Sequence, residues 1–126
     1  MPLWIACGAA AGGVLRYWCS GLVARSVGET FPWGTMVVNV SGSLLIGLIA
    51  EVTGPDGRLF IGSAARQFLM IGVLGGFTTF SSWSLQTLNL VQDGEWFLAG
   101  ANIVLSVALC LLGVWLGHAA GVWINR

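Results

Sequence analysis

Four hydroxyl side chains and three aromatic rings lie together in the segment Gly75–Trp83, inside an otherwise apolar stretch of the chain. Two adjacent glycines, Gly75 and Gly76, open this segment and favour non-helical backbone. The hydroxyl groups that follow can bond carbonyls that a helix break releases. Irregular backbone persists at membrane depth only where protein or a polar cavity shelters it. The segment therefore predicts a membrane helix that is broken between Gly75 and Thr78, with an ion or substrate site beside the break.

Two further sets of polar residues recur at every fourth position, and they are Thr35, Asn39 and Ser43 in one segment and Asn102, Ser106 and Cys110 in another. Residues four positions apart lie on one ridge of an α-helix. Neither set contains a formal charge, and amide and hydroxyl hydrogens can replace the water around a dehydrated anion. Two such tracks favour an anion path. The alternative is that these side chains only form hydrogen bonds between helices.

Three other residues each admit two interpretations. Phe80 and Trp83 are spaced to pack on one helix face or to lie against lipid. After a helix break, their ring edges, which carry the positive part of the quadrupole, can instead face an anion. Arg16 lies within an apolar segment, where it either draws anions into a vestibule or extends to the membrane surface. The sequence leaves these alternatives open.

The composition is that of an integral membrane protein. Of 126 residues, 56% are hydrophobic and only 8% are charged, and a soluble domain of this size needs a more highly charged surface. A span takes about 20 residues, so the chain holds about four spans and no soluble domain. The formal net charge is zero, which gives no basic field to attract nucleic acid. The three cysteines are odd in number, which argues against a disulfide framework.

Turn signals and aromatic residues divide the chain into a single transmembrane domain over residues 1–126. Its predicted spans are residues 3–23, 35–52, 67–91 and 96–123. The glycines of the first span, Gly8, Gly12 and Gly13, form a small-residue face for close helix contact. The break in the third span falls near the middle of the hydrocarbon layer. We therefore expect an all-α fold of four transmembrane helices with a broken third helix.

The arginines give only a weak signal for orientation. The spans place Arg58, Arg66 and Arg126 on one side of the membrane, and Arg25 with Arg16 on the other. Because Lys and Arg counts in short loops orient helices, so small a difference hardly selects a direction. This balance favours dual topology and an antiparallel two-fold dimer in which the broken helices cross. The alternative is one preferred orientation with the N-terminus inside.

Catalytic patterns are lacking, which argues against an enzyme. The chain has a single histidine, His118, and no Ser-His-Asp, metal-ligand or phosphate-loop arrangement. A small proton-coupled multidrug transporter has similar length and topology, but it needs a carboxylate deep in a span. Glu51 is the one acidic residue near a span interior, and its place before a Gly-Pro turn predicts a solvated helix end.

Three segments in order closely resemble the Fluc (CrcB) family of fluoride channels, and they are Gly12–Tyr17, Pro32–Asn39 and Gly75–Ser82. The resemblance covers all four predicted spans. Channels of this family are antiparallel dimers with two fluoride pores. The resemblance therefore implies passive, selective efflux of fluoride through the cell membrane.

The same resemblance assigns roles to individual positions. It implies that the backbone carbonyls of Gly75 and Thr78 hold a structural sodium ion that is not transported, and carbonyls released by a break suit a hard cation. The matching pore positions are Asn39, Phe80, Ser81 and Ser82, with Trp83 beside them. Asn102, Ser106 and Cys110 match the hydroxyl track of the fourth helix.

This sequence departs from the family pattern at two positions near the pore. Trp83 stands where the family usually has a second phenylalanine, and its indole N–H is a possible donor to fluoride. Gln86 stands where the family has a glutamate, which removes a charge from the anion entrance. Cys110 is also a poorer donor than serine. Some family members work as paired, non-identical subunits, so a heterodimer or a non-conducting partner subunit is the alternative to a homodimer.

Overall fold

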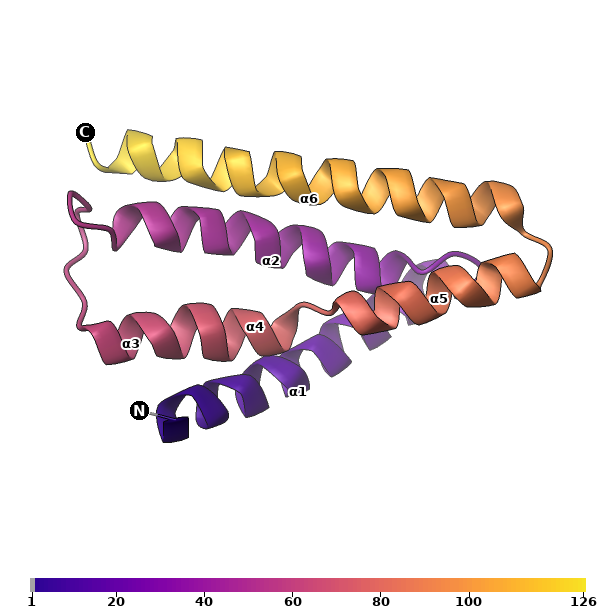
Figure 1. Ribbon diagram of the computed structural model, residues 1–126, viewed down its shortest axis with the longest axis horizontal. Coiled ribbons are helices and arrows are strands. Elements are labelled where there is room, and N and C mark those ends of the chain that lie inside the picture. The colour runs from indigo at the N-terminus through magenta and orange to yellow at the C-terminus, as the bar shows by residue number, and fades with distance from the viewer. Residues whose placement is uncertain (1) are drawn as a thin grey trace.

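The computed structural model describes residues 2–126, and these residues form four long helical segments. The elements in order are α1 (Pro2–Val27), α2 (Trp33–Val52), α3 (Ser63–Gln67), the π-helical turn η1 (Phe68–Val73), α4 (Leu74–Phe77), α5 (Phe80–Gln92) and α6 (Trp96–Ile124). The elements from α3 to α5 follow one another as the third segment, which bends where α4 gives way to α5 (Figure 1). The predicted all-α fold with an interrupted third helix is confirmed.

Three of the four segments are long and apolar enough to cross a membrane. They are α2, the segment from Ser63 to Gln92, and α6. The helix α1 has 26 residues, which is sufficient length, but it is not among these three. Glycines, two serines and two arginines keep its hydropathy low. The first predicted span is therefore a helix that composition alone does not mark as a membrane span.

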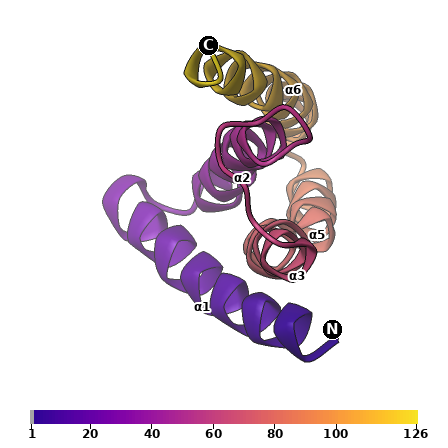
Figure 2. The same ribbon diagram turned by 90° about the vertical axis from the view of Figure 1, so that its left-hand side faces the viewer.

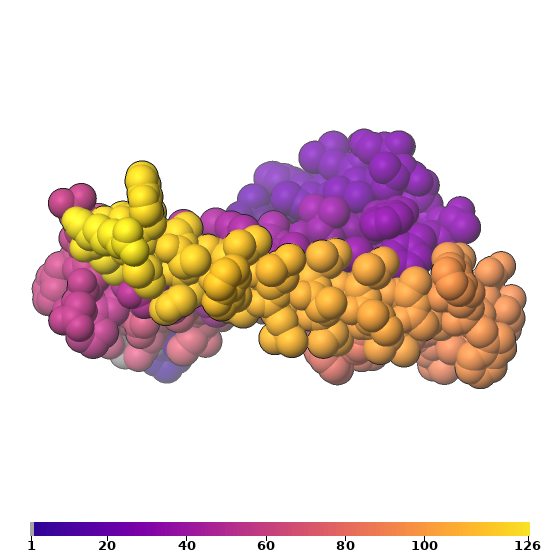
Figure 3. Space-filling model, turned by 90° about the horizontal axis from the view of Figure 1, so that it is seen from above, coloured from indigo at the N-terminus to yellow at the C-terminus, as the bar shows by residue number. Residues whose placement is uncertain are grey.

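The helices pair unequally. The most extensive pairing joins α2 to α6, which run side by side along most of their length (Figure 1). Seen from the end, α1 is inclined to the other helices and lies against the third segment, far from α6 (Figure 2). From above, α6 runs along the near face, and the later part of α1 with the purple segment that joins it to α2 protrudes beyond α6 (Figure 3).

Glycines allow α2 and α6 to approach each other closely. Gly113, Gly117 and Gly121 recur one turn apart on α6, and all three are buried. A Cβ atom on Gly117 would collide with the carbonyl oxygen of Leu44, and one on Gly121 would lie 2.6 Å from the Glu51 Cβ. Because small residues let helix backbones touch in a bilayer, this row sets the α2–α6 contact.

A second glycine interface joins α1 to the third segment. Gly8 of α1 faces Gly72, Gly12 faces the backbone of Val73 and Phe77, and Gly76 faces that of Ala9. A Cβ on Gly76 would lie 2.5 Å from the carbonyl oxygen of Ala9, and one on Gly8 would lie 2.7 Å from that of Phe68. Gly13, by contrast, faces open space. The small-residue face predicted for this helix is therefore formed by Gly8 and Gly12.

The break lies later than predicted. Gly75 and Gly76 belong to α4, and the non-helical residues are Thr78 and Thr79. The paired glycines are helical because Gly76 serves the close contact with α1 and needs no unusual backbone angle. The prediction that they interrupt the helix is wrong, and the two β-branched residues that follow them adopt the extended backbone instead.

Candidate functional site

Two extended threonines separate α4 from α5. Thr78 has φ −88° and ψ 158°, and Thr79 has φ −151° and ψ 119°. The Thr78 hydroxyl donates to the carbonyl of Leu74 at 3.0 Å, which closes the end of α4. The Thr79 hydroxyl oxygen accepts the N–H of Ser82 at 3.1 Å and caps the start of α5. Both ends of the break are thus closed by side chains of the break itself.

Asn39 of α2 holds the break from the side. Its Nδ2 donates to the Thr79 carbonyl at 2.9 Å, and its Oδ1 accepts the Thr79 N–H at 2.7 Å. Both backbone groups of Thr79 are therefore paired with one amide side chain. A buried backbone group needs such a partner where no helix supplies one. Asn39, the middle residue of the polar track on α2, therefore fixes the backbone of the break.

The break leaves backbone carbonyls without their helical donors, and two of them bear on the predicted sodium site. In a continuous helix the Gly75 carbonyl would accept the N–H of Thr79, but that N–H is taken by Asn39. The Thr78 carbonyl would accept the N–H of Ser82, which instead bonds the Thr79 hydroxyl. The two carbonyls that the resemblance assigns to a sodium ion are therefore among those that lose their helical donors at the break.

A cavity of about 390 Å³ lies beside the break, between α2, the third segment and α6. It is lined by residues of both polar tracks, by Gly75 and Thr78, and by aromatic rings, and all of these residues are uncharged. Among the predicted site residues, the lining includes Asn39, Gly75, Thr78, Phe80, Trp83, Ser106 and Cys110. One hollow thus brings together seven residues from three separate stretches of the sequence.

Asn102 does not line this cavity. It is fully buried, its Nδ2 donates to the Thr87 hydroxyl at 2.9 Å, and its Oδ1 accepts from Ser106 at 3.2 Å. Asn102 therefore joins α5 to α6, as the interhelical alternative for the polar tracks stated. Ser106, although only 5% exposed, reaches the cavity wall. Of the predicted α6 track, Ser106 and Cys110 therefore line the cavity, whereas Asn102 lies behind its wall and bonds Thr87 and Ser106.

Trp83 also bonds within the protein. Its indole Nε1 donates to the backbone carbonyl of Asn102 at 3.3 Å, so this N–H points to α6. The use of that N–H as a donor to fluoride, one possibility drawn from the sequence, does not match this geometry. Its ring lies 4.9 Å from that of Phe80 at an interplanar angle of 55°. The pair therefore presents a tilted aromatic wall to the cavity, and Phe80 is 76% exposed.

A second, smaller hollow of about 270 Å³ lies on the other side of the break. Arg16, Ser82 and Gln86 line it, and its lining shares Thr79 with the larger cavity. The Gln86 Oε1 atom is buried and has no hydrogen-bond partner among residues 2–126. Arg16 is thus placed at a polar recess next to the break. The predicted pore residue Ser81 lines neither hollow, and its hydroxyl lies 3.3 Å from that of Thr79.

Two residues of the site were not found from the sequence. Thr79 bonds Asn39, Ser81 and Ser82 and lines both hollows. Threonine is a preferred residue at the N-cap of a helix, so its place before Phe80 was an available signal. Thr87, the partner of Asn102, carries no such signal because the bond joins two helices across a turn of the chain.

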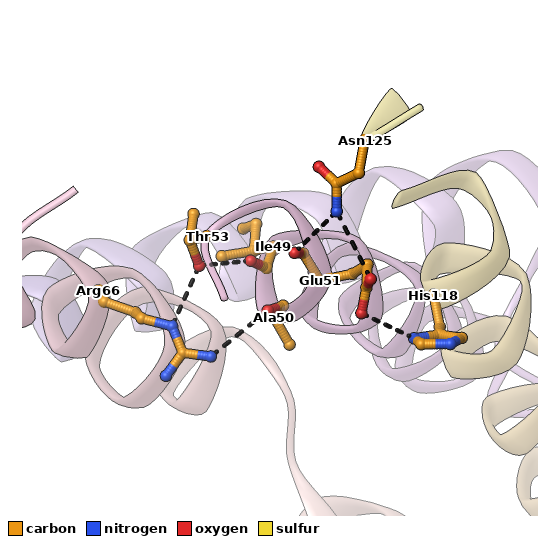
Figure 4. A network of polar contacts seen from close by, with 7 residues as sticks. All are labelled: Ile49, Ala50, Glu51, Thr53, Arg66, His118 and Asn125. Atoms are coloured by element: carbon orange, nitrogen blue, oxygen red, sulfur yellow. Dashed lines mark hydrogen bonds and ion pairs between the residues drawn. The ribbon is translucent and has the colours of Figure 1, made fainter. Parts of the chain in front are cut away.

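The far end of α2 holds the acidic residue that a proton-coupled transporter would require. Glu51 is the next-to-last residue of α2, and its Oε2 lies 3.3 Å from Nδ1 of His118 (Figure 4). Its backbone carbonyl accepts from Asn125 at 3.2 Å. These side chains are 32% and 56% exposed for Glu51 and His118. Glu51 therefore lies at a helix end and outside the lining of the cavity.

Comparison with known proteins gives one consistent result. The family model described as CrcB-like protein, camphor resistance (CrcB), matches residues 3–118. A Rhodospirillum rubrum protein named fluoride-specific ion channel FluC is 60% identical over 124 residues, covering 98% of this chain and 96% of the relative. Proteins with the same name from Opitutus terrae and Methylocella silvestris are 61% and 58% identical, and each alignment covers 98% of this chain. Those two alignments cover 93% and 95% of the relatives.

Proposed function

This chain belongs to the CrcB family of fluoride-specific ion channels, and from that premise we propose how it conducts. We propose that it is a multi-pass membrane channel in which fluoride passes beside the Thr78–Thr79 break and leaves the cell down its electrochemical gradient. No energy source is required for this movement. Protonated fluoride enters cells across lipid and dissociates inside, and the channel then returns the trapped anion.

The observation that carries the proposal is the uncharged cavity at the break. A fixed carboxylate there would repel an anion, whereas the lining offers amide, hydroxyl and thiol groups together with aromatic ring edges. Asn39 uses one of its two Nδ2 hydrogens on Thr79, which leaves the other for an anion. A donor-lined wall of this kind favours the smallest halide, because its donors replace the water that fluoride sheds.

The second hollow extends the proposed path beyond the break. Arg16 attracts anions there, and the Ser82 hydroxyl and Gln86 amide offer neutral donors. Thr79 belongs to both linings and marks the point where the hollow meets the cavity. Fluoride therefore passes from a recess with one positive charge to an uncharged wall formed by Phe80, Trp83 and the α6 track.

The break also suits a structural sodium ion. Sodium is a hard cation that prefers oxygen ligands, and the Gly75 and Thr78 carbonyls both lose their helical donors at the break. We assign these carbonyls as its ligands. A bound sodium ion would supply a fixed positive charge that holds the broken helices of two subunits together. The residues here hold and shape the site, and the ion itself is not transported.

An antiparallel dimer completes the site in this proposal. Gly75 and Phe80 are exposed in the single chain although they lie at the cavity, so a second copy has access to both. With two carbonyls from each chain, a two-fold axis at the break would surround one sodium ion with four oxygens. The balanced arginines allow both orientations in the membrane. A homologous chain could occupy the partner position in a heterodimer.

Flux from liposomes tests the channel. The purified chain is reconstituted alone, and fluoride and chloride efflux are followed with ion-selective electrodes. We expect fluoride efflux far faster than chloride efflux and no efflux from protein-free liposomes. Equal rates for both anions would contradict selectivity. Absence of flux from a well-folded dimer of this chain would instead indicate a partner subunit, which conducts only together with a homologue.

A further inference from the structure

A hollow of about 510 Å³ lies at one end of the bundle, away from the break. It is bounded by the loop between α2 and α3 and by the start of the third segment. Its polar lining comprises Thr53, Ser63, Arg66 and Gln67, and its apolar lining includes Phe60, Ile61, Met70 and Ile71. One side of the hollow can thus donate hydrogen bonds while the other is hydrocarbon.

Arg66 provides the charge of this hollow. Its Nε donates to the Thr53 hydroxyl at 3.1 Å, and its Nη2 donates to the Ala50 carbonyl at 3.4 Å (Figure 4). Both acceptors are neutral, so these bonds orient the guanidinium without neutralising it. Nη1 is not used in either bond. Asp56, the acidic residue of the loop, is not part of the lining.

The apolar side of the hollow is exposed to an unusual degree. Phe60 is 98% exposed and Leu59 is 58% exposed, although both lie in a loop. Ile71, five residues beyond Arg66, is 57% exposed. Large apolar side chains next to an arginine are typical of the membrane interface, where the bilayer changes from headgroups to hydrocarbon.

We propose that this hollow binds the phosphate of a glycerophospholipid. The phosphate accepts hydrogen bonds from the Arg66 guanidinium, and an acyl chain lies along Met70 and Ile71 toward the membrane interior. Phe60 inserts beside the glycerol region of the same lipid. Arginine suits this role because its planar fork matches phosphate geometry. In an antiparallel dimer, one such site would face each leaflet.

The apolar wall decides between a lipid and a free anion. Inorganic phosphate would gain only the contacts with Arg66 and neighbouring polar groups, and it would leave Phe60 and Ile71 unused. A phospholipid uses both halves of the hollow. Diacylglycerol, which has the chains without the phosphate, would use only the apolar half. These three probes therefore separate the contributions of charge and hydrocarbon.

Native mass spectrometry of the detergent-purified protein, titrated with phosphatidylglycerol, tests the proposal. We expect bound lipid in the unchanged protein, and in Arg66→Gln an apparent affinity at least about fivefold lower. Arg66→Lys, which keeps the charge and loses the fork, should fall between the two. Arg25→Gln is the matched control, since Arg25 is an exposed arginine near the end of α1, at the opposite end of the helix bundle (Figure 1).

Two further measurements keep the test decisive if Arg66→Gln is unstable, because Arg66 also bonds the end of α2. Phe60→Ser changes a nearly fully exposed side chain and should weaken phosphatidylglycerol binding about twofold or more while leaving the thermal midpoint unchanged. Equal affinity for diacylglycerol, unchanged binding in both Arg66→Lys and Phe60→Ser, or displacement of the lipid by millimolar inorganic phosphate would each overturn the proposal.

Discussion

The amide side chain of Asn39 pairs with both backbone groups of Thr79, donating to its carbonyl at 2.9 Å and accepting its N–H at 2.7 Å. This pairing joins α2 to the break in the third segment across 40 positions of sequence. It also takes the N–H that the Gly75 carbonyl would otherwise bind. One side chain therefore stabilises the extended backbone and exposes a carbonyl at the proposed sodium site.

Asn39→Leu should destabilise the protein as well as lower fluoride flux. The change leaves two partly buried backbone groups of Thr79 without partners, at a cost of about 1–3 kcal/mol for each group. The thermal midpoint in detergent, measured with and without sodium, checks this expectation. Ser43→Ala, one turn along the same ridge and also at the cavity, is the control and should keep its midpoint. An unchanged midpoint in Asn39→Leu would falsify the structural role of this amide.

Gly75→Ala should leave the single chain folded and impair its assembly. The nearest atom to an added Cβ is the carbonyl oxygen of Met70 at 3.9 Å, which is ordinary contact. In the proposed dimer, however, Gly75 lies against the sodium ion and the second subunit. We expect normal helix content by circular dichroism and a shift toward monomer in light scattering after size-exclusion chromatography. A stable dimer with normal flux would count against the assignment of Gly75 as a sodium ligand.

Gly12→Ala should disrupt the contact between α1 and the third segment. An added Cβ would collide with the carbonyl oxygen of Val73, and overpacking of this kind costs about 1–3 kcal/mol or more. Gly13→Ala is a close control, because the next residue faces open space. A comparison of thermal midpoints for the two variants measures the difference. Similar midpoints would show that α1 adjusts its position without cost.

Trp83→Phe should preserve conduction with a small loss of stability. The indole N–H bonds the Asn102 carbonyl at 3.3 Å, and losing a hydrogen bond of this type costs about 1 kcal/mol. The aromatic edge beside Phe80 remains, and phenylalanine is the residue that the family pattern has at this position. Fluoride efflux from liposomes should stay within about threefold of the original rate. A complete loss of flux would indicate that fluoride transfer depends on the indole itself.

Glu51→Gln should leave fluoride flux almost unchanged. Glu51 lies at the end of α2, and its partly exposed pair with His118 contributes about 0–1 kcal/mol to stability. Fluoride efflux with and without a pH gradient, measured for both proteins, checks this expectation. Uptake of a lipophilic cation driven by protons, and lost in Glu51→Gln, would support the transporter alternative over the channel.

The sequence by itself determined the class of the protein and most of the residues that form its candidate site. High hydrophobicity, few charges and three ordered segments predicted a four-helix membrane protein of the CrcB family, and the family comparison confirms that membership. Residue types at helical spacing also predicted the polar tracks, because a helix places every fourth residue on one ridge. These conclusions depend on composition and local periodicity, which are properties of the chain alone.

Only the tertiary structure decided what each polar residue bonds. The sequence assigned the break to the glycines, yet Gly76 is helical because α1 packs against it, and Thr78 and Thr79 carry the extended backbone. The sequence predicted that Asn102 lines the pore, but Asn102 is buried and its amide bonds Thr87, which joins α5 to α6. The physical reason is that helix packing and side-chain pairing are long-range, so identical local signals at Asn39 and Asn102 lead to different partners.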